Sequence, residues 1–228
     1  MFFGKGTIGQ LLRATASGHP TTLAVHQGDL RLTYRELDAL VDRFASHLLR
    51  QGIKKGDRIA YIFFNQWELL VAYHAITRIG GVIVSVNYRL TAAEMQHQLE
   101  KSEAVGLVYD IEFVDLVESL PDAVKAKLHR VVSGDAALGT ANIAFNDALA
   151  LEADLVFAAE KAVSADDDSG VWFTSGTTGM PKGAMVRHSY RLRRRFWPVR
   201  TAASPMAVGS YRSRRCSTGA PWRTCTWP

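Results

Sequence analysis

Cysteine is nearly absent from this chain of 228 residues, and long hydrophobic runs are missing altogether. The two cysteines, Cys216 and Cys225, lie close to the C-terminal end, so residues 1–190 hold no thiol for a disulfide or a cysteine-ligated metal site. No apolar run approaches the ~18 residues that a membrane-spanning helix needs. The first residues lack the charged start and long apolar core of a signal peptide. These absences exclude a disulfide-rich secreted protein and favour a cytoplasmic location.

Acidic residues are missing from residues 191–228, which contain nine arginines. The remaining 18 of the 27 basic residues accompany all 22 acidic residues in residues 1–190, which gives that part a net charge of −4. The arginine-rich segment also holds three of the five tryptophans and four of the seven prolines, without helical or strand periodicity. We therefore divide the chain into a body, residues 1–190, and a basic tail, residues 191–228, for which this composition predicts little regular structure.

The body alternates between helix and strand patterns. Residues 33–36 and 91–94 are capping boxes, and the helices behind them carry apolar residues at helical spacing. Apolar runs at residues 58–64, 82–86 and 105–109 are typical of strands that are covered on both faces. Three β–α alternations of this kind predict an α/β fold with a mostly parallel, helix-covered sheet.

Other segments of the body have weaker patterns. A small hairpin is expected around Gly28 and Asp29, which separate two short apolar runs. A second helix is expected over residues 65–80, with a cap formed by Asn65 to Glu68. The remaining expected elements are a short helix over residues 8–20, a strand over residues 130–133 and a short helix over residues 143–151.

Metal ligands are not expected in the body. Asp166 to Asp168 are adjacent on an extended chain, so their side chains point in alternating directions and cannot converge on one ion. Helical spacing accounts for Phe44, Trp67 and Met95 as core residues. Five further residues show no ligand spacing and are interpreted as structural or surface histidines: His26, His47, His74, His97 and His129. We therefore predict no metal site.

One stretch near the end of the body carries the candidate chemistry. Three apolar residues, Val171 to Phe173, lead into Thr174-Ser175-Gly176-Thr177-Thr178-Gly179-Met180-Pro181-Lys182-Gly183. Backbone N–H groups in such a loop can form an anion-binding nest, the hydroxyl groups add donors, and Lys182 adds a mobile charge suited to a phosphate. The three glycines, Gly183 included, would allow positive φ and close approach of a ligand.

This loop differs from a Walker A loop, in which Gly precedes the lysine and Ser or Thr follows it. Here Pro181 precedes Lys182 and Gly183 follows it. Composition by itself is equally compatible with a flexible Ser/Thr/Gly linker. The complete string decides between these interpretations.

Thr-Ser-Gly-Thr-Thr-Gly-x-Pro-Lys-Gly resembles the signature of the adenylate-forming enzymes, which include acyl-CoA synthetases, luciferases and adenylation domains of peptide synthetases. Residues 32–37, 56–60 and 87–90 resemble earlier landmarks of the acyl-CoA synthetases and occur in the family's order. The resemblance covers roughly residues 8 to 189. The landmark at 87–90 favours the fatty- or aryl-acid type. The body is thus similar to an incomplete N-terminal domain of the adenylate-forming fold.

The resemblance implies a two-step reaction in which a carboxylate attacks the α-phosphate of Mg-ATP and coenzyme A then displaces AMP. It assigns a catalytic role to Lys182 and substrate contact to His188, which stands where the family often has a histidine. It implies nucleotide binding by Thr174, Ser175, Gly176, Thr177, Thr178, Gly179 and Lys182. The expected small-molecule partners are ATP, coenzyme A and a carboxylic acid, with Mg as cofactor. The family's acidic Mg ligand has no match in this chain.

Beyond Tyr190 the resemblance ends. The family's later motifs are absent, and a GC-rich gene read out of frame would give the composition of the tail. We expect a truncated, frameshifted and inactive synthetase that leaves apolar surface uncovered and self-associates. Two alternatives stay open: a non-catalytic nucleotide-binding module, and an interaction protein that uses a genuine basic tail. Nucleic acid is not the expected partner.

Overall fold

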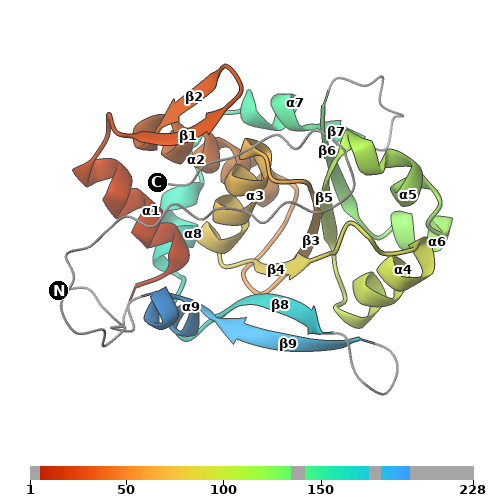
Figure 1. Cartoon of the computed structure of the whole chain (residues 1–228). Coiled ribbons are helices and arrows are strands. Elements are labelled where there is room, and N and C mark those ends of the chain that lie inside the picture. The colour runs from red at the N-terminus through yellow and green to blue at the C-terminus, as the bar shows by residue number, and fades with distance from the viewer. Residues whose placement is uncertain (1–5, 135–141, 175–180, 196–228) are drawn as a thin grey trace, which may run out of the picture.

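The computed structural model describes residues 6–134, 142–174 and 181–195 (Figure 1). Within them, β1 and β2 form a separate hairpin, and the other strands form a seven-stranded sheet in the order β7-β6-β5-β3-β4-β8-β9. The strands are β1 (Leu23–Gln27), β2 (Leu30–Thr33), β3 (Arg58–Ile62), β4 (Val82–Ser85), β5 (Gly106–Asp110), β6 (His129–Ser133), β7 (Asn142–Ala144), β8 (Asp168–Thr174) and β9 (Lys182–Arg187). The helices are α1 (Ile8–Gly18), α2 (Tyr34–Arg50), α3 (Trp67–Arg78), α4 (Ala92–Lys101), the 3₁₀ helix η1 (Ile111–Phe113), α5 (Val114–Glu118), α6 (Asp122–Lys125), α7 (Phe145–Leu149), α8 (Val156–Lys161) and α9 (His188–Arg195).

The prediction of a mostly parallel α/β sheet is confirmed. Strands β3 and β4, which contain the apolar runs around Ile59 and Ile83, pair in parallel in direct register. The pairings of β3 with β5, β5 with β6, β6 with β7 and β4 with β8 are also parallel. Only β9 runs antiparallel within the described sheet, as the return strand of a hairpin with β8. The expected N-terminal hairpin is present as β1 and β2.

Helices cover both faces of the sheet (Figure 1). The neighbouring residues Ile59 and Ala60 of β3 are fully buried, yet they belong to two different apolar clusters. One cluster includes residues of α2 and α3, among them Phe44, and the other includes residues of α4, among them Met95. Alternate side chains of a strand point to opposite faces, so both faces are buried and the strand runs are continuously apolar. Phe44 and Met95 are core residues, as expected, and Trp67 packs against the first cluster.

Helix starts follow the capping predictions with one exception. The side chains of Thr33 and Thr91 each accept a hydrogen bond from the backbone N–H at position N3 of their helix. The N3 glutamate side chain in turn accepts a hydrogen bond from the backbone N–H of the threonine, which completes both capping boxes. Thr7 caps α1 in the same way with Gln10, a box that the sequence analysis did not identify. At α3, however, the N-cap Gln66 makes no side-chain capping bond. The Trp67 N–H instead donates to Gln27 Oε1 of β1 at 2.8 Å.

Two boundaries differ from the expected ones. The segment expected to form a helix from residue 143 begins as β7, because Ile143 pairs in parallel with Val131 of β6, and only Phe145–Leu149 is helical. Helix α9 extends to Arg195, so regular structure reaches five residues into the segment assigned to the basic tail. The rest of that tail lies outside the described residues. The division near residue 190 stays a prediction.

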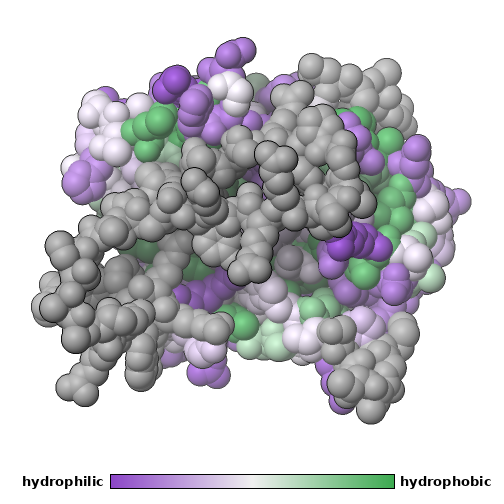
Figure 2. Space-filling view, in the orientation of Figure 1, coloured by the Kyte–Doolittle hydropathy of each residue, from purple (hydrophilic) through white to green (hydrophobic). Residues whose placement is uncertain are grey.

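Strand β9 is an exposed edge of the described sheet. All its residues except Val186 are exposed, and Met185 is 47% exposed. Figure 2 shows hydrophobic and near-neutral residues along the lower edge of the view, over β8 and β9, and hydrophilic residues over β1 and β2 at the top. An unpaired edge strand with apolar side chains can pair with another chain. Self-association through uncovered apolar surface stays a prediction.

A buried ion network joins four helices. Arg78 of α3 is fully buried and contacts Asp38 and Asp42 of α2, the latter at 2.6 Å. Arg13 of α1 binds Asp42 at 2.7 Å and Glu160 of α8 at 2.7 Å. Removing one partner from such a network leaves uncompensated charges in a low dielectric, so each member constrains the others.

We expect Arg78→Met to lower the free energy of unfolding by up to about 3–5 kcal/mol, because the partly buried Asp38 and Asp42 lose one of their two cations and keep only Arg13. Urea denaturation measures the change. Arg58→Met is the control: Arg58 pairs at 2.8 Å with Glu103, which is 79% exposed, so its loss should cost less than about 1 kcal/mol. Equal losses for the two variants would contradict a structural role for the buried network.

Candidate phosphate-binding hairpin

Strand β8 places the start of the signature loop at the carboxyl edge of the parallel sheet. Val171, Trp172 and Phe173 have high β propensity, and β8 lies between β4 and β9. The strand ends at Thr174, which is exposed. Open α/β sheets bind ligands outside the carboxyl ends of their strands. The expected strand and its exit point are therefore present, and the loop leaves the sheet where a ligand can reach it.

The β8–β9 register sets Thr174 directly opposite Lys182. The Thr174 hydroxyl donates to the Lys182 carbonyl oxygen at 3.4 Å, and both residues are exposed. Trp172 pairs with Ala184 two positions earlier in the strand, so Trp172, Thr174 and Lys182 share one face of the hairpin. The fold thus joins the Thr174 hydroxyl to the backbone of Lys182 and sets both exposed residues on one face at the two ends of the loop.

The middle of the signature lies outside the described residues. This applies to five of the residues expected to bind nucleotide: Ser175, Gly176, Thr177, Thr178 and Gly179. Their roles, like those of Thr174 and Lys182, stay predictions.

Gly183 has a packing role in the structure. It lies in β9 opposite Phe173, and it is not among the described glycines with positive φ. A Cβ at this position would lie 2.9 Å from Val171 Cγ1, closer than real Cβ atoms approach such a carbon. The expectation that Gly183 provides positive φ is therefore wrong. Its missing side chain instead makes room for the buried Val171 of the neighbouring strand.

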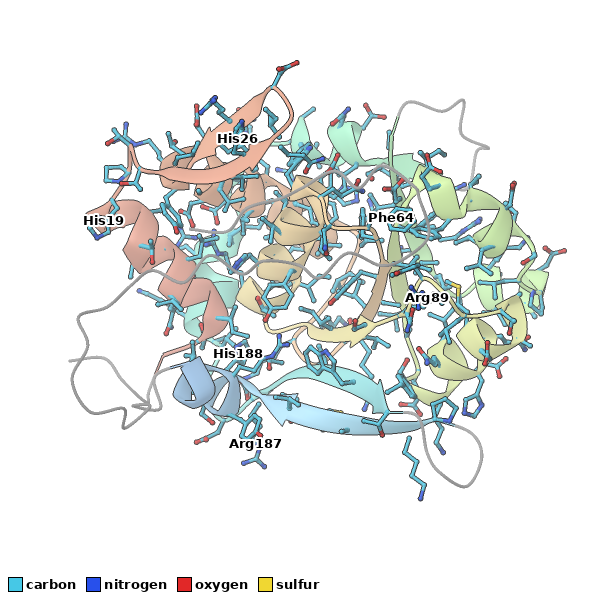
Figure 3. The ribbon with its side chains drawn as sticks, viewed as in Figure 1. His19, His26, Phe64, Arg89, Arg187 and His188 are labelled. Atoms are coloured by element: carbon cyan, nitrogen blue, oxygen red, sulfur yellow. The ribbon has the colours of Figure 1, made fainter. Side chains whose placement is uncertain are left out.

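His188 lies at the other end of β9 from Lys182. It begins α9, is completely buried, and its Nδ1 accepts a hydrogen bond from the Ile8 N–H at 3.2 Å (Figure 3). Burial lowers the pKa of His188 to about 4, with smaller contributions of the same sign from Arg191 and Lys55 and an opposing one from Asp167. The contact satisfies one of the free N–H groups at the start of α1. Substrate contact by His188 stays a prediction.

Two carboxylates at the same edge of the sheet were not identified from the sequence. Glu68 lies in the first turn of α3, after β3, and Asp110 ends β5. Burial raises the pKa of Glu68 to about 7, and the neighbouring Asp110 adds to the shift. A carboxyl group with a perturbed pKa, as at Glu68, is a candidate functional residue. The signal for Glu68 in the sequence is an acid in the first turn of a helix that follows a buried strand.

The described part of the chain shows neither a metal cluster nor a membrane span. Within it, no three His, Cys, Asp or Glu side chains are grouped so that they could hold an ion. In nucleotide sites Mg is held mostly by the phosphates and water, with only one or two carboxylates, so the Mg that the resemblance implies stays a prediction. No helix among the described residues combines the length and the apolar character that crossing a membrane requires.

Comparisons with known proteins agree with this geometry. A family model described as AMP-binding enzyme matches residues 12–210. The chain is 34% identical over 177 residues to the 3-hydroxybenzoate–CoA/4-hydroxybenzoate–CoA ligase of Thauera aromatica, covering 77% of this chain and 33% of that protein. It is 32% identical over 174 residues to the medium/long-chain-fatty-acid–CoA/3-oxocholest-4-en-26-oate–CoA ligase of Mycobacterium marinum, covering 74% and 32%.

A solved structure of the N-terminal domain of FACL13 from Mycobacterium tuberculosis aligns with a TM-score of 0.66 at 29% identity. The alignment covers 80% of this chain and 44% of that one. The chain spans about a third of the length of the curated relatives it matches.

We expect the protein to lose stability as the pH falls from 6.5 towards 4. In this window the unfolded chain protonates His188 while the folded chain does not, so the free energy of unfolding decreases as the pH falls. A shift from 6.5 to about 4 corresponds to about 3 kcal/mol once the pH is below both values. Urea denaturation at successive pH values measures this slope.

His188→Asn should flatten that slope, because asparagine keeps an acceptor for Ile8 but does not titrate. The exposed His19, labelled in Figure 3, provides the control, and His19→Gln should keep the parent slope. An unchanged slope in His188→Asn would show that other groups cause the acid sensitivity.

Proposed function

The chain belongs to the AMP-binding enzyme family, and on that premise we propose that it contains the phosphate-gripping part of an ATP-dependent acid–thiol ligase. The activity proposed for the whole protein is activation of a carboxylic acid as an acyl-adenylate, followed by transfer to coenzyme A. The observation that carries this proposal is the opposition of Thr174 and Lys182 across the hairpin, exposed at the carboxyl edge of a parallel sheet.

In the first step, the substrate carboxylate oxygen attacks the α-phosphorus of ATP, the bond to the bridging oxygen breaks, and pyrophosphate leaves. Negative charge moves towards the β- and γ-phosphates during this step. Lys182 is proposed as the cation that stabilises this charge, and Thr174 as a hydroxyl donor. Ser175, Gly176, Thr177, Thr178 and Gly179 are proposed to contribute further donors from the loop. No step is assigned to Mg.

In the second step, the coenzyme A sulfur attacks the acyl carbon, and AMP leaves with the electrons of the C–O bond. The Thauera relative is named for hydroxybenzoates and the Mycobacterium relative for fatty and steroid acids. We therefore propose a carboxylic acid of the aryl or fatty class as the substrate.

The runner-up function is nucleotide binding without turnover. The 228 residues align with about a third of the length of each of these curated relatives. Adenylation also requires the ribose and the carboxylate to be positioned, and positioning can account for about 7–11 kcal/mol of a reaction barrier. The 228-residue chain by itself is therefore proposed to bind ATP without activating an acid.

Lys182→Ala should weaken ATP binding by about 1.5–3 kcal/mol, the range for a hydrogen bond to a charged group. Isothermal titration calorimetry with the full chain measures this change. Lys161→Ala is the matched control, because Lys161 is an exposed lysine on α8 that lies against Phe157. Equal affinities for the Lys182→Ala variant and the parent protein would remove Lys182 from the site.

We expect no carboxylate-dependent release of pyrophosphate from the 228-residue chain above background. The physical reason is that the loss of even one aimed hydrogen-bond donor typically lowers the rate about 10²–10³-fold. The assay uses ATP, Mg and a panel of fatty and aromatic acids. Pyrophosphate release that disappears in Lys182→Ala would instead show that the chain is a working enzyme.

A further inference from the structure

We infer that Arg191 of α9 is a positioning residue for the phosphate-binding hairpin. Its guanidinium group packs on Trp172 and thereby fixes the hairpin face that also carries Thr174 and Lys182. The link between Arg191 and ATP binding rests on the proposed function. The contact between Arg191 and Trp172 does not depend on that function.

Three side chains from three elements form the stack. The Arg191 guanidinium carbon lies 3.9 Å from the centre of the Trp172 ring and 5.3 Å from the centre of the Tyr73 ring of α3. The Arg191 guanidinium also donates a hydrogen bond to the Tyr73 hydroxyl. All three side chains are half-buried. Partial burial strengthens a cation–π contact because it removes competing water, and indole is the best aromatic partner for a cation.

Trp172 has little freedom on its strand. Its backbone lies between Ser85 of β4 and Ala184 of β9. Its indole occupies the space that a Cβ on Gly170 would need, since such an atom would lie 2.2 Å from Trp172 Cζ3. The indole is thus fitted over the glycine of its own strand, and Arg191 packs on the ring. Removing the guanidinium group would leave a half-buried ring without this packing partner.

The stack lies beside the proposed nucleotide contacts. Thr174 is two residues beyond Trp172 on the same face, a separation of about 7 Å along a strand. Lys182 opposes Thr174 on that face. The other face of the hairpin, with Val171 and Phe173, packs against the second apolar cluster. One face is therefore held by the core, and the face proposed to meet phosphate is held by Arg191.

The consequence is a link between α9 and the loop. A residue from the arginine-rich segment becomes part of the support of the site, although it is not proposed to touch the nucleotide. We expect Arg191→Leu to weaken ATP binding about fivefold, the equivalent of one partly desolvated cation–π contact. Arg191→Lys keeps a cation near the ring and should restore part of the affinity.

The test uses the full chain with three variants: Arg191→Leu, Arg191→Lys and the control Arg187→Leu. Arg187 is exposed, ends β9 and points away from the sheet in Figure 3, so its loss should change neither readout. The first readout is the ATP dissociation constant. The second is amide hydrogen exchange without nucleotide, which should become faster at Trp172 to Thr174 in Arg191→Leu while β3 and β5 keep the parent rates.

The outcomes separate this inference from the proposed function. If the parent chain does not bind ATP, the proposed function fails, and hydrogen exchange at Trp172 to Thr174 still decides the role of Arg191. Unchanged exchange there, or faster exchange spread equally over the sheet, would overturn the inference, as would a failure of Arg191→Lys to restore any affinity. If Arg191→Leu does not fold, Trp172→Phe provides the same comparison with a smaller ring under the guanidinium.

Discussion

The parallel pairing of β8 with β4 is the constraint on which the candidate site depends. It joins Ile83, Val84 and Ser85 to Gly170, Val171 and Trp172, two segments separated by more than eighty residues of chain. Parallel pairing makes both strands end at the same edge of the sheet. A strand side chain changes faces with each residue, so a slip of one position would bury Thr174 and expose Val171. The register therefore fixes which residues can meet a ligand.

The hairpin of β8 and β9 then divides its residues between two tasks. Val171 and Phe173 point into an apolar cluster, and Gly183 gives Val171 the room to do so. The opposite face presents Thr174 and Lys182 to solvent. Lys182 is thus an exposed lysine on a hairpin whose other face packs against the core. Trp172 lies on the same face of the hairpin as Lys182, so we infer that contacts which hold Trp172 also help to position Lys182.

The helices on the α1 side connect this hairpin to the rest of the body. His188 accepts a hydrogen bond from Ile8, and Arg13 and Arg78 bind carboxylates of α2 and α8. Of these groups His188 and Arg78 are fully buried, and an isolated charge would be costly there, so Arg78 is paired with carboxylates. Helix α9 is attached both to α1 through His188 and to β8 through Arg191. The start of the chain and the far end of the body thus form one connected unit.

The sequence by itself determined the features that depend on near neighbours. Thr33 and Thr91 cap their helices through residues three positions on, and the apolar runs of β3 and β4 required a sheet buried on both faces. The signature string located the loop. Tertiary structure decided the contacts whose partners lie far apart in the sequence. Ile143 belongs to a strand because it pairs with Val131 of β6. The backbone N–H of Trp67, at the start of α3, donates to Gln27 of β1, and Gln66 makes no side-chain cap. The buried position of His188 and the stack on Trp172 have the same origin, since no local pattern encodes a partner that only folding brings into reach.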